Sequence, residues 1–173
     1  MSIVTLNDRG VRSVTAFGSL NTGSMIFIKK LTASSSGDLS FVNGASSVVL
    51  DSTYKEYLFT FKNIHPSASA KLGVNFSDDT SSHSYDITKT NTLFNVQHDE
   101  ADSEALLQYN TDRDLAQSTS AQRFSLQIGN DNDQSVVGTL HLFDPSNTTF
   151  VKHYLATVQG ANASNYTQQL LTA

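Results

Sequence analysis

The stretch "TYKEYLFTFKNIHP", residues 53–66, carries the strongest pattern in this chain of 173 residues. Tyr57, Phe59 and Phe61 alternate with smaller or polar side chains, and alternate side chains of a strand share one face. A platform that stacks sugars or bases needs exposed rings flanked by cations in a groove. Strict alternation that ends at a Pro66 turn favours burial instead, which contributes about 1.5–3 kcal/mol per ring. We therefore predict that the three rings lie at the centre of a β-sheet core.

Period-two alternation recurs along the chain, separated by turn-forming runs of Ser, Gly, Asn, Asp and Pro. The other alternating segments are residues 39–41, 72–76, 94–96, 124–128 and 140–142. Eight to ten short strands at a spacing of about 8–12 residues, each with one buried face, indicate two packed sheets. The predicted fold is all-β: an antiparallel two-sheet sandwich, jelly-roll-like, over residues 24–173.

Three segments depart from the alternating pattern. Residues 98–109 hold helix formers behind acidic residues, which predicts one or two helical turns in a long connection. The tail from residue 162 has no clear period and is either a short helix or a loose end. Residues 1–23 precede the first strong strand and read as an extended arm. Its candidate assembly contacts are Arg9, Arg12, Val14 and Phe17.

The composition restricts the class of protein. Ser, Thr and Asn fill 55 of the 173 positions, and these residues favour turns over long helices. There is no cysteine, which excludes disulfides, thiol nucleophiles and cysteine-based metal sites. The first residues lack a basic head followed by an apolar core, and the longest early apolar run is only residues 25–28. We expect a chain made in a cytoplasm, with no membrane insertion.

Charge is unevenly distributed along the chain. The net charge of −5 argues against binding a nucleic-acid backbone. Between residues 77 and 115 nine acids face two bases, a net −7, whereas the first thirty residues carry four bases and one acid, a net +3. Two interpretations remain: solvated loops with an exposed arm, or a charge-steered contact between neighbouring subunits.

The sequence contains no motif that specifies catalysis or metal binding. "GNDNDQ", residues 129–134, resembles the start of a calcium loop, but the required glycine and acid are replaced by Val136 and Leu142. The acids of residues 98–104 adjoin one another in one polar segment, whereas a glycosidase pair faces across a cleft. No nucleophile elbow, phosphate-binding glycine loop or histidine ligand spacing occurs. We predict no catalytic residue, metal or cofactor, and hence no enzyme.

One loop could bind a sugar. Residues 77–85, "SDDTSSHSY", bring Asp78, Asp79, His83 and Tyr85 together in sequence. Carboxylates can bond sugar hydroxyls while an aromatic ring stacks on the pyranose face. The same residues are also typical of an exposed hairpin tip, so both interpretations stay open.

Three passages carry a family resemblance: residues 5–44, residues 50–79 and "FDPSNTTFVKHYLA", residues 143–156. Together they resemble virion structural proteins of tailed bacteriophages, especially marine ones, and the β-sandwich modules of phage tail and fibre proteins. The resemblance implies a non-enzymatic virion component with other virion proteins as partners, usually a homo-oligomer, trimer or higher. Family members continue past the point where this chain stops, so either the chain is an incomplete version or its last strands are dispensable. If strands are missing, an open sheet edge is expected.

These observations define two leading hypotheses of different classes. The first is a phage structural protein of the tail, fibre, collar or head surface, which assembles through its N-terminal arm and sheet edges. The alternative is a host-adhesion module of a tail fibre that binds host-surface glycans, with Tyr85 beside Asp78 or Asp79. A third, a glycan depolymerase, would require two acids facing each other in a cleft.

Overall fold

The computed structural model describes residues 25–161 and 166–173. The chain forms two compact units, residues 1–30 and residues 31–173. Within the first unit, residues 25–30 adopt no helix or strand. The candidate arm contacts Arg9, Arg12, Val14 and Phe17 lie outside the described residues.

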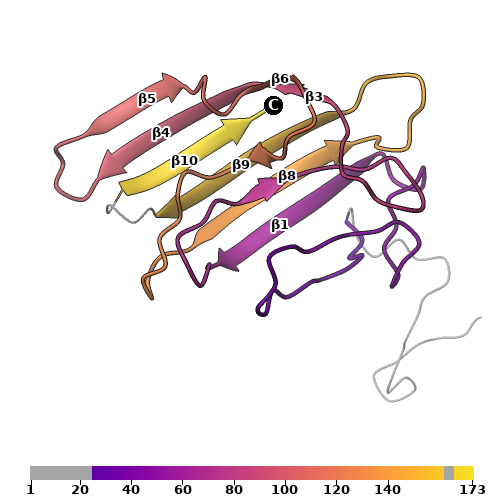
Figure 1. Cartoon of the computed structure of the whole chain (residues 1–173), viewed down its shortest axis with the longest axis horizontal. Helices are drawn as coiled ribbons and strands as arrows, with labels where there is room; N and C mark the ends of the chain where they lie inside the picture. The colour runs from indigo at the N-terminus through magenta and orange to yellow at the C-terminus, as the bar shows by residue number, and fades with distance from the viewer. Residues whose placement is uncertain (1–24, 162–165) are drawn as a thin grey trace, which may run out of the picture. The chain divides into compact units, whose positions relative to one another are not determined.

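The second unit is all-β and antiparallel, as predicted (Figure 1). Its strands are β1 (Glu56–Ile64), β2 (Gly73–Val74), β3 (Lys89–Asn91), β4 (Leu93–Asp99), β5 (Ala105–Tyr109), β6 (Leu115–Ser118), β7 (Gln122–Arg123), β8 (Val136–Phe143), β9 (His153–Ala161) and β10 (Tyr166–Thr172). Six strands form one sheet in the order β1-β8-β9-β10-β4-β5, and β2-β7 and β3-β6 form two small sheets. Over the described ranges there is no helix, and so none that could span a membrane.

The aromatic stretch of residues 53–66 forms β1, and its predicted alternation is confirmed. Tyr57 is buried, Phe59 and Phe61 are half-buried on the same face, and Leu58 points to the opposite side. The expected central position is wrong, however, because β1 pairs only with β8 and is an edge strand of the sheet. The rings are covered by other segments instead: Phe41 packs edge-on against Phe59, with ring centroids 5.4 Å apart.

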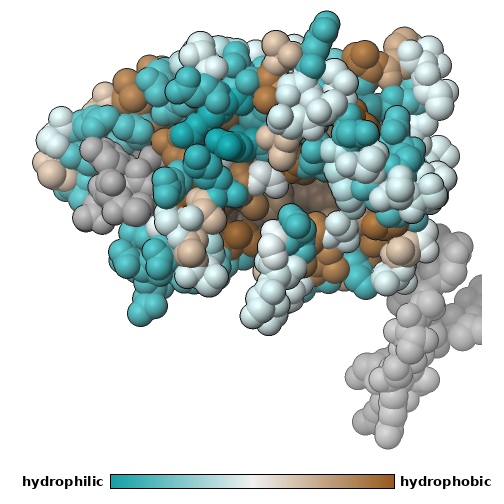
Figure 2. Space-filling model, in the orientation of Figure 1, coloured by the Kyte–Doolittle hydropathy of each residue, from teal (hydrophilic) through white to brown (hydrophobic). Residues whose placement is uncertain are grey.

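The core lies between one face of the six-stranded sheet and a covering layer. We define the covering layer as the two small sheets and the segments that join them; it crosses in front of the sheet in Figure 1. Phe124 of this layer is almost fully buried and contacts Phe61 and Tyr154, with centroids 6.3 and 6.5 Å away. Seen from this side, most of the surface is polar (Figure 2). The covering layer therefore hides the apolar side chains of one sheet face.

Close backbone packing in the sheet requires glycine at position 138. A Cβ there would lie 2.6 Å from the Thr157 carbonyl oxygen and 2.9 Å from Cα of Val158, on the adjacent strand β9. Distances this short are not tolerated by a real side chain, so β8 and β9 would have to separate. Gly138 thus fixes the approach of two central strands.

The helical turns predicted for residues 98–109 are absent. Residues 93–99 and 105–109 are strands β4 and β5, joined by a tight turn. The Asp99 carboxylate accepts hydrogen bonds from the backbone N–H groups of Ser103 and Glu104, both at 2.8 Å, which closes the turn. Asp102 has a positive φ of 56°, which no helix permits. Local side-chain bonding by Asp therefore overrode helix propensity.

The tail is neither a helix nor a loose end. Residues 166–172 form β10, which pairs with β9 on one side and β4 on the other. Leu170 and Thr172 are buried on the covered face of the sheet. The strand is short and has neutral polar residues at its start, so its sequence shows no clear period although it lies inside the sheet.

Several expected strands are shorter than their alternation suggested. Residues 39–41 adopt no strand, only Gly73–Val74 of residues 72–76 is one, and residues 124–128 keep a single bridge at Ile128. One cause is visible at Leu72, whose backbone N–H donates to Oγ of Ser125 at 2.8 Å. Serine hydroxyls here replace the carbonyl acceptors that a continuous ladder would use.

Candidate functional site

The second unit carries a large apolar surface on the side of the six-stranded sheet that faces away from the covering layer. We call this side the open face. Of the eleven large hydrophobic residues that are exposed in the described part of residues 31–173, eight lie on it and three lie in loops. The eight are Leu58, Phe94, Val96, Leu107, Tyr109, Val137, Leu155 and Leu171, with exposures of 39–73%. A concentration of this kind on one face marks an interaction surface rather than scattered exposure.

The strand register aligns these residues in rows across the sheet. One row crosses all six strands: Thr60, Thr139, Thr157, Leu171, Phe94 and Tyr109. It contains no residue that is charged at neutral pH. The adjacent row, from Val137 to Leu107, is also free of charged residues. The middle of the open face is therefore uncharged and mixes apolar side chains with threonine and glutamine.

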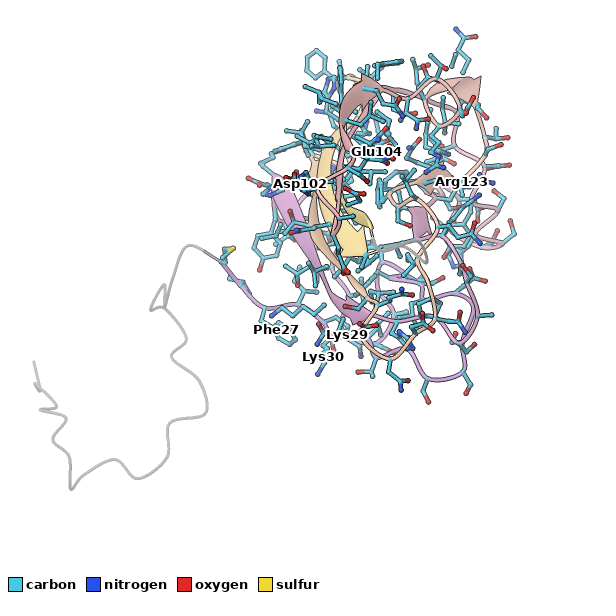
Figure 3. All side chains as sticks on the ribbon, turned by 90° about the vertical axis from the view of Figure 1, so that its left-hand side faces the viewer. Phe27, Lys29, Lys30, Asp102, Glu104 and Arg123 are labelled. Carbon is cyan, nitrogen blue, oxygen red and sulfur yellow. The ribbon has the colours of Figure 1, made fainter. Side chains whose placement is uncertain are left out.

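Charged groups lie at the borders of the open face. His141 Nδ1 is 2.5 Å from the Glu56 carboxylate, and the imidazole stacks on Phe143 at a centroid distance of 6.3 Å. At the other end, His98 Nε2 is 3.1 Å from the Asp102 carboxylate, in the turn that Figure 3 labels at Asp102 and Glu104. These pairs make a polar border around an apolar centre, as in protein–protein interfaces.

The open face also presents an exposed ring beside an acid. Phe94 and Tyr109 pack edge to face with centroids 5.2 Å apart, and both are more than 40% exposed. The Tyr109 hydroxyl donates to the Asp114 carboxylate at 2.6 Å, and this bond, followed by burial, raises the pKa of the phenol. Sequence reasoning missed this pair because Tyr109 was assigned to a helical segment. The alternation of Phe94 and Val96 was recognised, but sequence does not tell which face is covered.

The predicted glycan loop is organised around Asp79. Its carboxylate accepts backbone N–H groups of Ser84, at 2.6 Å, and of His83, and the hydroxyls of Ser84 and Ser77 at 2.9 and 3.1 Å. These donors, Ser84 first, hold the pKa of Asp79 far below its usual value. With its oxygen atoms engaged by its own loop, Asp79 has a structural role.

The other three glycan candidates are only partly brought together. His83 lies against Asp79, with Nδ1 3.2 Å from the Asp79 carbonyl oxygen. Asp78 is exposed and Tyr85 is half-buried, and no bond described for the loop joins either to Asp79. His83 and Tyr85 both have a φ of 50°, a left-handed conformation that such residues rarely adopt. The loop is therefore tightly shaped around Asp79, and the glycan contact stays a prediction.

A group of buried polar side chains lies where the covering layer meets strands β4 and β5 of the large sheet. Asn95, at 0% exposure, accepts from Asn110 and Gln108 at 3.3 and 3.2 Å. Gln122 donates to the carbonyl oxygens of Arg113 and Arg123 at 3.2 and 2.8 Å. The Asn95 bonds link β4 to β5 and to the β5–β6 connection, and Gln122 links β7 to that same connection, a structural role that the sequence did not indicate.

Two hollows lie in the described part of the second unit. An apolar cavity of about 10 Å³ lies beside Ile128, Val136 and Leu170 and is smaller than a small-molecule site. An open hollow of about 410 Å³ is lined by Ser69, Ala70, Lys71, Arg123 and Gln127, on the covering layer where Figure 3 labels Arg123. In the part of the chain that the structure describes, no three His, Cys, Asp or Glu residues are placed to share a metal ion.

The open face is thus the most distinctive surface of the described residues, and its exposed large side chains resemble those of a protein–protein contact surface. No protein-family model, curated protein or solved structure matches the chain.

Proposed function

We propose that this chain is a non-enzymatic structural protein of a phage virion, part of the tail, fibre, collar or head surface. The observation that carries the proposal is the open face, where eight large apolar side chains lie exposed across all six strands. A surface of this kind is costly to leave in water and is typical of chains that assemble with partners. The phage resemblance of residues 5–44, 50–79 and 143–156 supplies the class of assembly.

The finer architecture belongs to the same proposal. The sheet and its covering layer form a jelly-roll-like sandwich, and residues 1–23 serve as an arm that docks on a neighbouring subunit. Arg9 and Arg12 give the arm positive charge, while residues 77–115 are acidic on every copy. Opposite charges on two parts of one chain favour contact between the arm of one copy and the acidic segment of another.

Particle incorporation tests the proposal. The chain is produced with an epitope tag in infected cells, and purified virions are examined by immunoblot and immunogold labelling. We expect stoichiometric incorporation at one defined site on the particle. Deletion of residues 1–20 should leave a folded domain but abolish incorporation, with circular dichroism as the check on folding. Absence of the full-length chain from purified virions would refute the function, and normal incorporation of the deletion variant would refute the arm.

One observation favours a second candidate, a glycan-binding adhesion module. Phe94 and Tyr109 are exposed rings, and Asp114 lies against the Tyr109 hydroxyl at 2.6 Å. Rings stack on sugars while carboxylates accept their hydroxyls. A glycan array should then show binding that Tyr109→Ala removes, and the loop variant Tyr85→Ala compares the two candidate sites. An array without binding, together with unchanged host adsorption of both variants, would exclude this function.

A further inference from the structure

We infer that the open face is a two-fold interface, on which a second copy of this chain packs the same sheet face. The inference deepens the proposed function, and rests on it, by naming the partner and the surface of the first assembly step. In such an interface the same residues of both copies meet around one axis.

The size of the open face suits a stable pair. Six strands spaced at about 4.8 Å, with seven residues of about 3.3 Å each, give a projected area of about 650 Å² per copy. The accessible surface of a corrugated face exceeds its projection, and a stable interface covers about 800 Å² per partner. The whole open face, polar positions included, therefore has about the area that a specific dimer needs, without any contribution from loops.

The charge distribution also suits a second copy. Each chain carries a net charge of −5, so two copies repel each other unless their contact surface is neutral. The row from Thr60 to Tyr109 and the row from Val137 to Leu107 contain no charged side chain, and the charged groups lie at the border. The open face is thus the part of the sheet on which like copies meet with least repulsion.

The geometry of sheets makes the contact self-complementary. Two twisted sheets pack about 10 Å apart with interdigitated side chains when their facing rows alternate in size. The long row has three threonines on one half and the bulkier Leu171, Phe94 and Tyr109 on the other half. A two-fold axis near the row centre places the threonine half of one copy against the bulky half of the other. The dimer then has four layers, with the two covering layers outside.

Sedimentation of the full chain tests the inference with a matched pair of substitutions. Val137→Glu introduces a charge on the open face, at a side chain that is 42% exposed. Val151→Glu makes the same change in the β8–β9 connection, at a side chain that is 78% exposed. We expect a wild-type dimer, at least a tenfold weaker dimer for Val137→Glu, and no change beyond twofold for Val151→Glu. Circular dichroism verifies that each variant is folded.

Cysteine cross-linking gives a second measurement that does not depend on weakening the fold. The chain has no cysteine, so single substitutions report one position each. Facing backbones about 10 Å apart are too distant for a direct disulfide, so a short bis-maleimide reagent is used. The reagent should join two copies of Thr157→Cys, near the centre of the long row, and should not join copies of Lys71→Cys in the covering layer.

Each outcome decides the inference. A wild-type chain that is monomeric at all concentrations overturns it, as does a dimer that Val137→Glu leaves intact and Thr157→Cys fails to cross-link. A dimer that is lost on deletion of residues 1–20 would show that the arm, and not the second sheet, covers the face. The proposed function fails separately: a chain that dimerises through this face but is absent from virions refutes the function and leaves the interface standing.

Discussion

Tyr154 carries a buried hydroxyl whose removal should stabilise the protein. Among the described residues this hydroxyl has no hydrogen-bond partner, although its ring contacts Phe76 and Phe124 in the core. A buried, unpaired polar group costs about 1–3 kcal/mol. Tyr154→Phe removes the hydroxyl and keeps the ring contacts, so we expect the free energy of unfolding to rise by about 1 kcal/mol at neutral pH.

The alkaline range gives the same reasoning a sharper test. Burial raises the pKa of Tyr154 from 10.0 to about 12. The unfolded chain therefore loses this proton from pH 10, while the folded chain holds it until about pH 12. Stability falls with pH wherever the unfolded state binds fewer protons, and two pKa units correspond to about 3 kcal/mol. This contribution is fully present below pH 10 and is lost as pH rises towards 12.

Urea unfolding followed by far-ultraviolet circular dichroism measures both effects. Wild type and Tyr154→Phe are compared at pH 7 and at steps between pH 10 and 12, and the other tyrosines titrate equally in both proteins. The difference in stability should widen with pH by up to about 3 kcal/mol in favour of the variant.

The matched control is Tyr57→Phe. The Tyr57 hydroxyl donates to the Asp51 carbonyl oxygen at 2.8 Å, so its loss should destabilise by about 0.5–1.5 kcal/mol. Two identical substitutions in one core then change stability in opposite directions. If Tyr154→Phe destabilises as much as Tyr57→Phe, or if the difference from wild type stays constant between pH 10 and 12, the reasoning about Tyr154 is wrong.

Three further substitutions test the fold and the loop. Gly138→Ala should lower the free energy of unfolding by about 1–3 kcal/mol, because the added Cβ meets the backbone of β9. Gly37→Ala, which has open space around it, should leave the stability unchanged in the same thermal melts. Equal effects of the two substitutions would contradict the close approach of β8 and β9. Phe124→Ala should cost about 3–5 kcal/mol in urea unfolding, and a loss below about 1 kcal/mol would show that the covering layer does not pack on the sheet. Asp79→Ala should abolish the hydrogen-exchange protection of the amides of residues 83–84 without shifting the global melting temperature. In wild type this protection is present above the ordinary carboxyl pKa, and it persists in acid until the pH falls through the lowered pKa of Asp79. Unchanged protection in the variant would refute the organising role of the carboxylate.

Sequence periodicity identified the strands of the large sheet better than it identified their surroundings. The alternation of residues 57–61 and 140–142 corresponds to β1 and β8, because long alternating runs with aromatic residues have few other stable conformations. The alternation of Phe94 and Val96 identified a strand, but the rings and methyl groups point to the open face. Which side a covering layer occupies depends on segments distant in sequence, and no local pattern records it.

The helix prediction failed where a side chain bonds to nearby backbone. Residues 99–104 contain helix formers, yet Asp99 closes a turn with Ser103 and Glu104. In the loop of residues 77–85, which the sequence left open between a glycan contact and a hairpin tip, Asp79 bonds to its own loop. In a chain this rich in Ser, Asn and Asp, such bonds decide local conformation, and their partners are set by geometry that residue type alone does not give.

The position of β10 between β9 and β4 determines when the sheet can be completed during synthesis. Strand β4 ends at Asp99 and its partner β10 begins at Tyr166, so one side of β4 waits for 67 further residues. At about 5–20 residues per second the ribosome needs about 3–13 s to make them. Throughout that interval one edge of β4 is unpaired over residues 93–96. An unpaired edge of this kind can pair with another nascent chain. The six-stranded sheet therefore forms late, and a holding chaperone that shields residues 93–99 should raise the yield of folded protein.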